Sequence, residues 1–282
     1  MPTSTPTRAT PEYVLGTGAD EMARLGLQHR LWSAAAHNLW ERARVQPGLT
    51  VLDLGCGPGH ATLDLAQIVG PTGRVIAVDE SASFLKQLHD QAVSRKHHNI
   101  ERVLCDVHDL ASALDDDAGM IDVAYARWVF CFLSRPEDVV KALARLVKPG
   151  GRVAVQDYFN YERCLTLAPR REAFSKVINA VGASWRARGG DTDIMGRLPG
   201  MFIKHGFRVE DLQVVQRLAR PGDMMWHWPN SFWQTFLPRL VETGFITPED
   251  RAAFERTWDE AGRDPGAFVQ LPPVFELIVE RV

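Results

Sequence analysis

The stretch Val51-Leu52-Asp53-Leu54-Gly55-Cys56-Gly57-Pro58-Gly59-His60 decides the fold of this 282-residue chain. An apolar, β-branched run leads into three glycines at alternate positions, and segment 60–69 then carries apolar residues at helical spacing. We therefore predict a strand, a tight loop and a helix. Glycine allows a positive φ or close contact with a ligand, and the start of a helix offers unpaired N–H groups. The stretch favours a nucleotide-like cofactor, although a tight turn alone would also use glycines.

An acidic residue after the next strand strengthens this interpretation. Segment 74–79 is an apolar run that ends in Asp79, with Glu80 directly behind it. A carboxylate about 20 positions beyond the glycines is well placed to accept hydrogen bonds from ribose hydroxyls. The glycine loop and the acid together indicate a nucleotide site more specifically than either does alone.

The spacing of the glycines separates the classes of nucleotide site. The nicotinamide fingerprint is GxGxxG, whereas this chain has Gly55-x-Gly57-x-Gly59 followed by His60. No Gly-Lys-Ser/Thr follows the loop, which excludes a P-loop.

Three segments together resemble the class I S-adenosylmethionine-dependent methyltransferases. They are Asp53-x-Gly55-x-Gly57-x-Gly59, Asp79 at the end of the second strand, and Leu146-Val147-Lys148-Pro149-Gly150-Gly151 before a later strand. The resemblance covers residues 45–158 most closely. It implies an α/β fold with a Rossmann-like seven-stranded sheet in the order 3-2-1-4-5-7-6, the last strand antiparallel, with helices on both faces and a helical cap. It also implies S-adenosyl-L-methionine as cofactor and S-adenosyl-L-homocysteine as product.

The chain divides into four expected regions. We predict an N-terminal helical cap over 1–44, a cofactor-binding core over 45–158, a lid insertion over 159–198, and the rest of the core with an aromatic-rich helical insertion over 199–282. The strands are predicted at 51–54, 74–79, 103–107, 121–126, 152–158, from 207 onward, and at 273–279.

The resemblance also assigns roles to residues around the loop. Asp53 would orient the loop and reach the methionine amino group through water. Asp106 would hydrogen-bond the adenine amino group and Val107 would offer its amide to the ring, while Arg127 would touch the methionine end.

The segment Tyr13-Val14-Leu15-Gly16 with Arg24-Leu25-x-x-Gln28 resembles the cap of bacterial small-molecule members of the family. This resemblance implies that Tyr13, Arg24 and Gln28 face the loop and hydrogen-bond the methionine carboxylate.

The sequence indicates the catalytic residues less clearly than the cofactor-binding ones. Transfer from a sulfonium is an in-line displacement that depends on alignment in a desolvated site, so no single catalytic residue is obligatory. His227, Asp157 and Tyr158 are the candidate catalytic residues, and His60 is expected to begin the loop helix. His227 lies in an aromatic and methionine cluster over 224–236, and such clusters are more often core packing than a binding site.

The amino-acid composition indicates which kinds of partner the protein can have. The net charge of −3, from 32 basic and 35 acidic residues, gives no electrostatic surface for a phosphate backbone, so a small-molecule substrate is expected and no nucleic acid. Four scattered cysteines without a CxxC pair indicate reduced thiols and a cytoplasmic location. We expect no metal site and no membrane segment; the apolar insertions are compatible with a homodimer.

Two other classes stay open at this point. An NAD(P)-dependent oxidoreductase shares the strand, the glycine loop and the distal acid. A binding or regulatory protein could hold the cofactor without transferring a methyl group. The acceptor atom, whether oxygen, nitrogen or carbon, cannot be read from the sequence.

Overall fold

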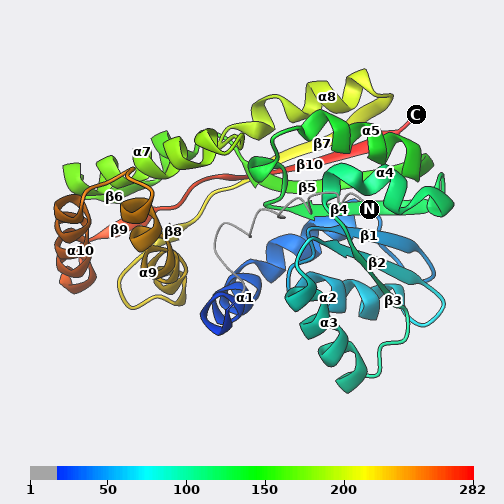
Figure 1. The fold of residues 1–282 in the computed structure, drawn as a ribbon, viewed down its shortest axis with the longest axis horizontal. Helices are drawn as coiled ribbons and strands as arrows, with labels where there is room; N and C mark the ends of the chain where they lie inside the picture. Colours follow the sequence, from blue (N-terminus) through cyan, green and yellow to red (C-terminus); the bar gives the residue numbers. More distant parts are fainter. Residues whose placement is uncertain (1–17) are drawn as a thin grey trace, which may run out of the picture.

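The computed structural model describes residues 18–282, and its central element is a seven-stranded sheet (Figure 1). The strands lie in the order β3-β2-β1-β4-β5-β10-β7. Their bounds are β1 Thr50–Leu54, β2 Arg74–Asp79, β3 Ile100–Leu104, β4 Ile121–Arg127, β5 Val147–Tyr158, β7 Phe207–Val215 and β10 Val274–Arg281. Strand β10 is antiparallel to both of its neighbours, and the pairs from β3 to β5 are parallel. Because β7 and β10 are the sixth and seventh strands of this sheet along the chain, the predicted order is confirmed.

Helices cover both faces of the sheet because its strands alternate their side chains between two apolar cores. Val51 and Val75 face the core beneath helices α1 and α2, whereas Leu52 and Ile76 face the opposite core. Figure 1 shows α1, α2 and α3 on one side of the sheet and α4, α5 and α8 on the other. The bounds are α1 Ala19–Arg42, α2 His60–Val69, α3 Ala82–Ser94, α4 Leu110–Ala113, α5 Pro136–Leu146 and α8 Leu198–Lys204.

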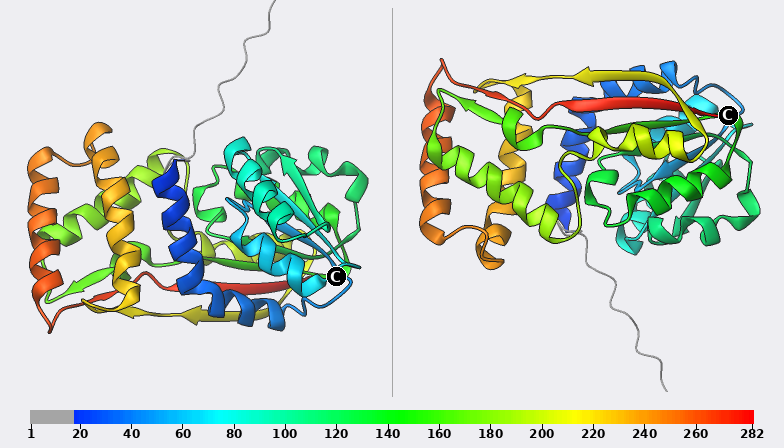
Figure 2. Two further views of the ribbon diagram at one scale, coloured as in Figure 1. Left: turned by 90° about the horizontal axis from the view of Figure 1, so that it is seen from below. Right: turned by 90° about the horizontal axis from the view of Figure 1, so that it is seen from above.

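A lobe of helices and a second small sheet extends from the β5-β10-β7 side (Figure 2). The small sheet has three antiparallel strands in the order β6-β9-β8. The elements of the lobe are α6 Tyr161–Cys164, β6 Thr166–Ala168, α7 Glu172–Ala187, β8 Leu218–Ala219, α9 His227–Glu242, α10 Pro248–Arg263 and β9 Phe268–Gln270. The segments predicted as a lid and as an aromatic-rich insertion therefore come together in one lobe, and the sequence did not indicate its sheet.

Each strand of the small sheet is the near neighbour along the chain of a main-sheet strand. Strand β6 follows β5, β8 follows β7, and β9 precedes β10. Since the main sheet ends in the order β5-β10-β7 and the small sheet runs β6-β9-β8, the two form one interrupted three-stranded ribbon.

The predicted position of the third strand was wrong by three residues. The strand was expected at 103–107, but β3 is Ile100–Leu104 and pairs with residues 75–79 of β2. β3 lies at the edge of the sheet and none of its side chains is fully buried, so it lacks the apolar run on which the prediction depended. Asp106 consequently follows the strand and caps the next turn, where its carboxylate accepts the His108 amide.

None of the helices within residues 18–282 is long and apolar enough to cross a membrane.

Replacing Gly59 by alanine is expected to destabilise the fold. Gly59 has φ +85°, and an added Cβ would lie 2.3 Å from Leu88 on α3. Left-handed strain plus overpacking should lower the free energy of unfolding by about 2–4 kcal/mol. Gly119→Ala is the matched control, because Gly119 has φ +69° with no atom within 4 Å of an added Cβ, and backbone strain alone costs about 1–2 kcal/mol. Urea unfolding that gave equal losses for both variants would contradict the packing argument.

Candidate active site

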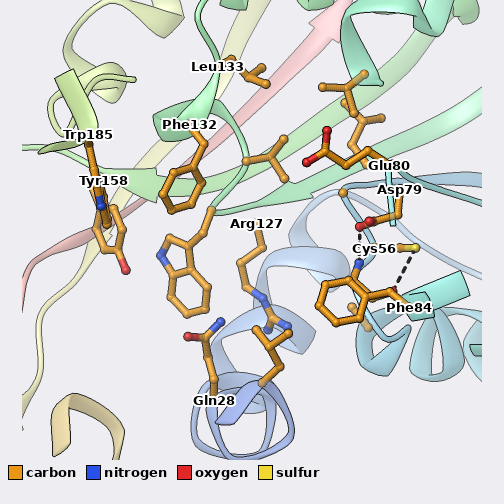
Figure 3. Close-up of a pocket in the computed structure, with 18 of the residues that line it drawn as sticks. Gln28, Cys56, Asp79, Glu80, Phe84, Arg127, Phe132, Leu133, Tyr158 and Trp185 are labelled. Carbon is orange, nitrogen blue, oxygen red and sulfur yellow. Dashed lines mark hydrogen bonds between the residues drawn. The ribbon is translucent and has the colours of Figure 1, made fainter. Parts of the chain in front are cut away.

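A cavity of about 1040 Å³ lies at the carboxyl ends of the parallel strands, between the sheet and the lobe. This is where open α/β sheets bind their ligands. Figure 3 shows Asp79, Glu80 and Phe84 on one side of it and Tyr158 and Trp185 on the other, with Arg127 and Phe132 between them. We call the first side the loop half and the second the aromatic half.

The glycine loop forms one wall of the loop half. Gly57 has φ +55° and no atom within 4 Å of an added Cβ, so its backbone is open to a ligand. Gly55 also lines the cavity. Gly59 does not, because it faces Leu88 of α3. The prediction that Gly59 touches the ligand is therefore corrected: this glycine permits close packing of the loop helix instead.

Asp79 holds the loop in place. Its Oδ2 accepts a hydrogen bond from the Gly57 amide and its Oδ1 accepts one from the Ser81 amide, both at 2.8 Å. Burial raises the pKa of Asp79, and these two backbone hydrogen bonds oppose the shift. Glu80 also lines the cavity but is exposed.

Asp106 and Val107 line the cavity next to His108. The Asp106 Oδ1 accepts a hydrogen bond from the His108 ring Nδ1 at 2.7 Å, and the His108 Nε2 accepts one from the Arg135 backbone amide at 3.4 Å. This pair of bonds puts the ring proton on Nδ1. Burial opposes ionisation, but the hydrogen bonds from His108 lower the pKa of Asp106 overall. His108 had no signal in the sequence, because its role depends on the turn after β3.

Asp53 is a buried carboxyl at the end of β1. It is 2% exposed, and its Oδ2 accepts the Thr62 hydroxyl at 2.6 Å. Burial raises the pKa of Asp53 to about 7, against the opposing effects of Thr62 and of the Arg127 guanidinium. The sequence placed Asp53 correctly at the loop but gave no sign that its charge would change near neutral pH.

Two donors, Arg127 and Gln28, lie between the halves. Arg127 Nη1 is buried and has no hydrogen-bond partner among the described residues. Gln28 Oε1 accepts both Arg24 Nη1 at 3.1 Å and Trp228 Nε1 at 2.9 Å, so the other end of this amide is a donor. Tyr13, predicted to join them, lies outside the described residues.

The aromatic half is built from rings that come from core and lobe. Trp128, which follows β4, stacks on Tyr158 of β5 at 6.0 Å and on Trp228 of α9 at 5.7 Å between ring centroids. Tyr161 and Trp185 extend the wall. Trp128 has φ +54°, a conformation that a non-glycine residue adopts at a cost and that is typical of functional sites.

The three candidate catalytic residues lie in different environments, and only one of them lines the cavity. Tyr158 lines the cavity, and burial raises the pKa of its phenol well above the usual value, so the hydroxyl stays protonated. Asp157 is 0% exposed, and its oxygens accept the Tyr158 and Cys131 amides, so it supports the backbone instead of facing the cavity. His227 is exposed at the start of α9 and is not among the lining residues. The prediction of His227 as a base is therefore corrected; its tryptophan neighbours suggested a pocket, but the helix turns the imidazole outward.

Charged groups are distributed unequally between the halves. The carboxylates and histidines that line the cavity lie at or shortly after the ends of β1, β2 and β3. Among the described residues, those of the aromatic half include neither a carboxylate nor a histidine. The arrangement therefore suits a polar, nucleoside-like ligand on one side and an apolar, flat ligand on the other.

Comparison with known proteins finds methyltransferases. A family model described as a methyltransferase domain matches residues 52–155. The ubiquinone/menaquinone biosynthesis C-methyltransferase of Stutzerimonas stutzeri is 29% identical over 168 residues, which cover 57% of this chain and 61% of the relative. The enzyme of the same name from Pseudomonas savastanoi is 32% identical over 145 residues, covering 48% of this chain and 54% of the relative. The chain thus spans less than two thirds of these relatives.

Solved structures share the fold at low identity. Geranyl diphosphate C-methyltransferase from Streptomyces coelicolor, crystallised with S-adenosyl-L-homocysteine, has a TM-score of 0.56 at 19% identity and covers 97% of this chain and 86% of its own. The [4+2]-cyclase SpnF has a TM-score of 0.57 at 17% identity and covers 88% of this chain and 80% of its own.

Asp53 should make stability depend on pH. Its folded-state pKa of about 7 lies above the ordinary aspartate value of 3.8, so the folded state holds this proton more tightly than the unfolded state does. The resulting stabilisation is present below pH 4 and is lost as the pH rises through 7. We expect the free energy of unfolding of the wild type, relative to Asp53→Asn, to fall by on the order of 4 kcal/mol between pH 4 and pH 8. Urea unfolding across this pH range measures the difference, and Asp259→Asn, at an exposed aspartate, is the control. If the difference between the wild type and Asp53→Asn did not change with pH, the raised pKa of Asp53 would be refuted.

Proposed function

The chain belongs to the class I S-adenosylmethionine-dependent methyltransferases, and on that premise we propose that it methylates a small apolar or aromatic molecule by in-line displacement. The observation that carries the proposal is the division of one cavity into a loop half with carboxylates and open backbone and an aromatic half without them. The relatives' printed activity, C-methylation, is compatible with this acceptor site.

The loop half fits S-adenosyl-L-methionine by its chemistry. Asp79 keeps lone pairs beyond those used by Gly57 and Ser81, and these would accept the ribose hydroxyls, with Glu80 beside them. Asp106 and Val107 would serve the adenine. Bound there, the cofactor supplies a methyl group on a cationic sulfur.

The methionine end would meet Asp53, Arg127 and Gln28. Arg127 Nη1 is a buried donor without a partner among residues 18–282, and a cofactor carboxylate that accepted its hydrogen bond would remove the cost of leaving it unsatisfied. Asp53 in its charged form would pair with the amino group, and its pKa of about 7 makes that charge sensitive to the ligand. Tyr13 remains a proposed contact of the same group.

The aromatic half would hold the acceptor against Trp128, Tyr158 and Trp185 and keep water away from the transferred group. Because no histidine or carboxylate of the described chain lines this half, the acceptor must arrive as a competent nucleophile or lose its proton through solvent. The protonated Tyr158 hydroxyl would orient the acceptor by a hydrogen bond.

A second function has one specific observation in its favour. The chain resembles the fold of a [4+2]-cyclase as closely as that of a methyltransferase, so the fold is compatible with a protein that does not transfer a methyl group. An NAD(P)-dependent oxidoreductase remains the least supported alternative. A cytoplasmic location, a homodimer and the absence of a nucleic-acid partner stay predictions.

Calorimetric titration tests the cofactor. We expect S-adenosylmethionine and S-adenosylhomocysteine to bind and NADPH not to bind. Asp79→Ala would also release the Gly57 amide, so Asp79→Asn is the sharper variant, because its side-chain oxygen still accepts that amide. We expect Asp79→Asn to weaken binding of S-adenosylhomocysteine roughly tenfold or more, as for a lost charge-assisted hydrogen bond. Binding of NADPH alone would assign the protein to another class.

Turnover tests the acceptor half. With phenolic, amine and carbon acceptors as probes, we expect release of S-adenosylhomocysteine that is dependent on the acceptor. Tyr158→Phe should lower turnover roughly tenfold, the effect of one lost hydrogen bond in the transition state, without changing the affinity for S-adenosylhomocysteine. His227→Ala should retain wild-type turnover from pH 6 to 9. Cofactor binding without turnover on any probe would favour the non-transferring protein.

A further inference from the structure

A chain of hydrogen bonds leads from the loop half of the cavity to the surface between α1 and α2. Arg127 Nη2 lies 3.2 Å from His29 Nδ1, and His29 Nε2 lies 3.0 Å from Asp64 Oδ2. The same Asp64 oxygen lies 3.0 Å from Nε2 of His37, a residue whose side chain is half exposed. Hydrogen bonds through two histidines on α1 and one carboxylate on α2 thus link Arg127 in the cavity wall to a half-exposed side chain at the surface.

The hydrogen bonds fix the proton on His29. A guanidinium can only donate, so His29 Nδ1 is the acceptor from Arg127 and the ring proton resides on Nε2, which donates to Asp64. Burial alone would raise the pKa of Asp64, but the hydrogen bonds from His29 and His37 lower it overall, so the carboxylate is charged. His29 is therefore held as a neutral ring that accepts from Arg127.

The groups around His29 come from several elements. His60 of α2 stacks on it with ring centroids 5.6 Å apart and an interplanar angle of 22°. Burial, with the charge of Arg127 among the neighbouring cations, lowers the pKa of His60 to about 4, so His60 is uncharged at neutral pH. The other titratable or charged groups near this cluster include Arg127 from β4, Asp64 from α2, Asp53 from β1, Arg95 directly after α3, and Arg30 and His37 on α1 itself.

We propose that His29 is a positioning residue for cofactor binding, which holds the Arg127 guanidinium so that Nη1 faces the cofactor carboxylate. The proposal rests on the proposed function. Of the two terminal nitrogens of Arg127, Nη2 is fixed by His29 and Nη1 has no partner among the described residues. A long arginine side chain loses conformational freedom when it is fixed, so an anchor present before binding lowers the entropy lost on binding.

The test is calorimetric binding of S-adenosylhomocysteine to the full chain with two substitutions of His29. His29→Leu removes the acceptor and should raise the dissociation constant roughly tenfold at pH 8, the effect of one lost hydrogen bond to a charged group. His29→Asn keeps an oxygen acceptor towards Arg127 and should restore most of the affinity. His98→Leu, at an exposed histidine before β3, should bind as the wild type does.

A double-mutant cycle with Arg127→Met separates positioning from general destabilisation. If His29 acts through Arg127, His29→Leu should cause no further loss of affinity in the Arg127→Met background. Equal losses in both backgrounds, or wild-type affinity in His29→Leu, would overturn the proposal. Absence of S-adenosylhomocysteine binding to the wild type would instead overturn the proposed function, so the two failures are distinguishable.

Discussion

The hydrogen bond from the Gly57 amide to the Asp79 carboxylate fixes the loop after β1 against the end of β2, and the geometry of the site depends on it. Helix α2 begins directly behind that loop at His60. Two side chains of α2 then support the cavity: Thr62 holds the buried Asp53, and Asp64 holds His29 behind Arg127. A displacement of the loop would therefore move the groups expected at both ends of the cofactor, because α2 transmits the position of one to the other.

The aromatic half of the cavity is held in place mainly by packing of its rings, whereas the loop half is held by hydrogen bonds. The Trp128 ring is stacked between Tyr158 and Trp228, and its amide donates to the Gln156 carbonyl at 2.8 Å, so its left-handed backbone is held from both sides. Strain of this kind persists only where the surroundings over-determine it. A site of fixed rings and few charges contributes alignment and exclusion of water, which are the contributions that a displacement on a sulfonium carbon requires.

The sequence predicted the fold well because its signals are local. The glycine loop, Asp79 and the apolar runs of the buried strands each lie within one short segment, and the sheet order followed from the family pattern. Edge strand β3 was misplaced because exposed strands lack that pattern. The site was predicted less completely, since the direction of His227 depends on the start of α9, and His29 acquires its role only where α1 crosses α2. No pattern along the chain reports such contacts between helices.

The ribbon formed by β5-β10-β7 and β6-β9-β8 makes the acceptor lobe a module attached along a single side of the sheet. The chain enters and leaves the lobe beyond the outer ends of these strands, whereas the glycine loop, Asp79 and Asp106 lie at or just after the ends of β1, β2 and β3, across the sheet. Insertions that lengthen or reshape the lobe therefore alter one wall of the cavity without changing the strands that end at the loop half. Under the proposed function, such an architecture would let a lineage diversify its acceptors while the cofactor chemistry stays constant, and it makes the ends of the ribbon natural junctions for chimeric enzymes.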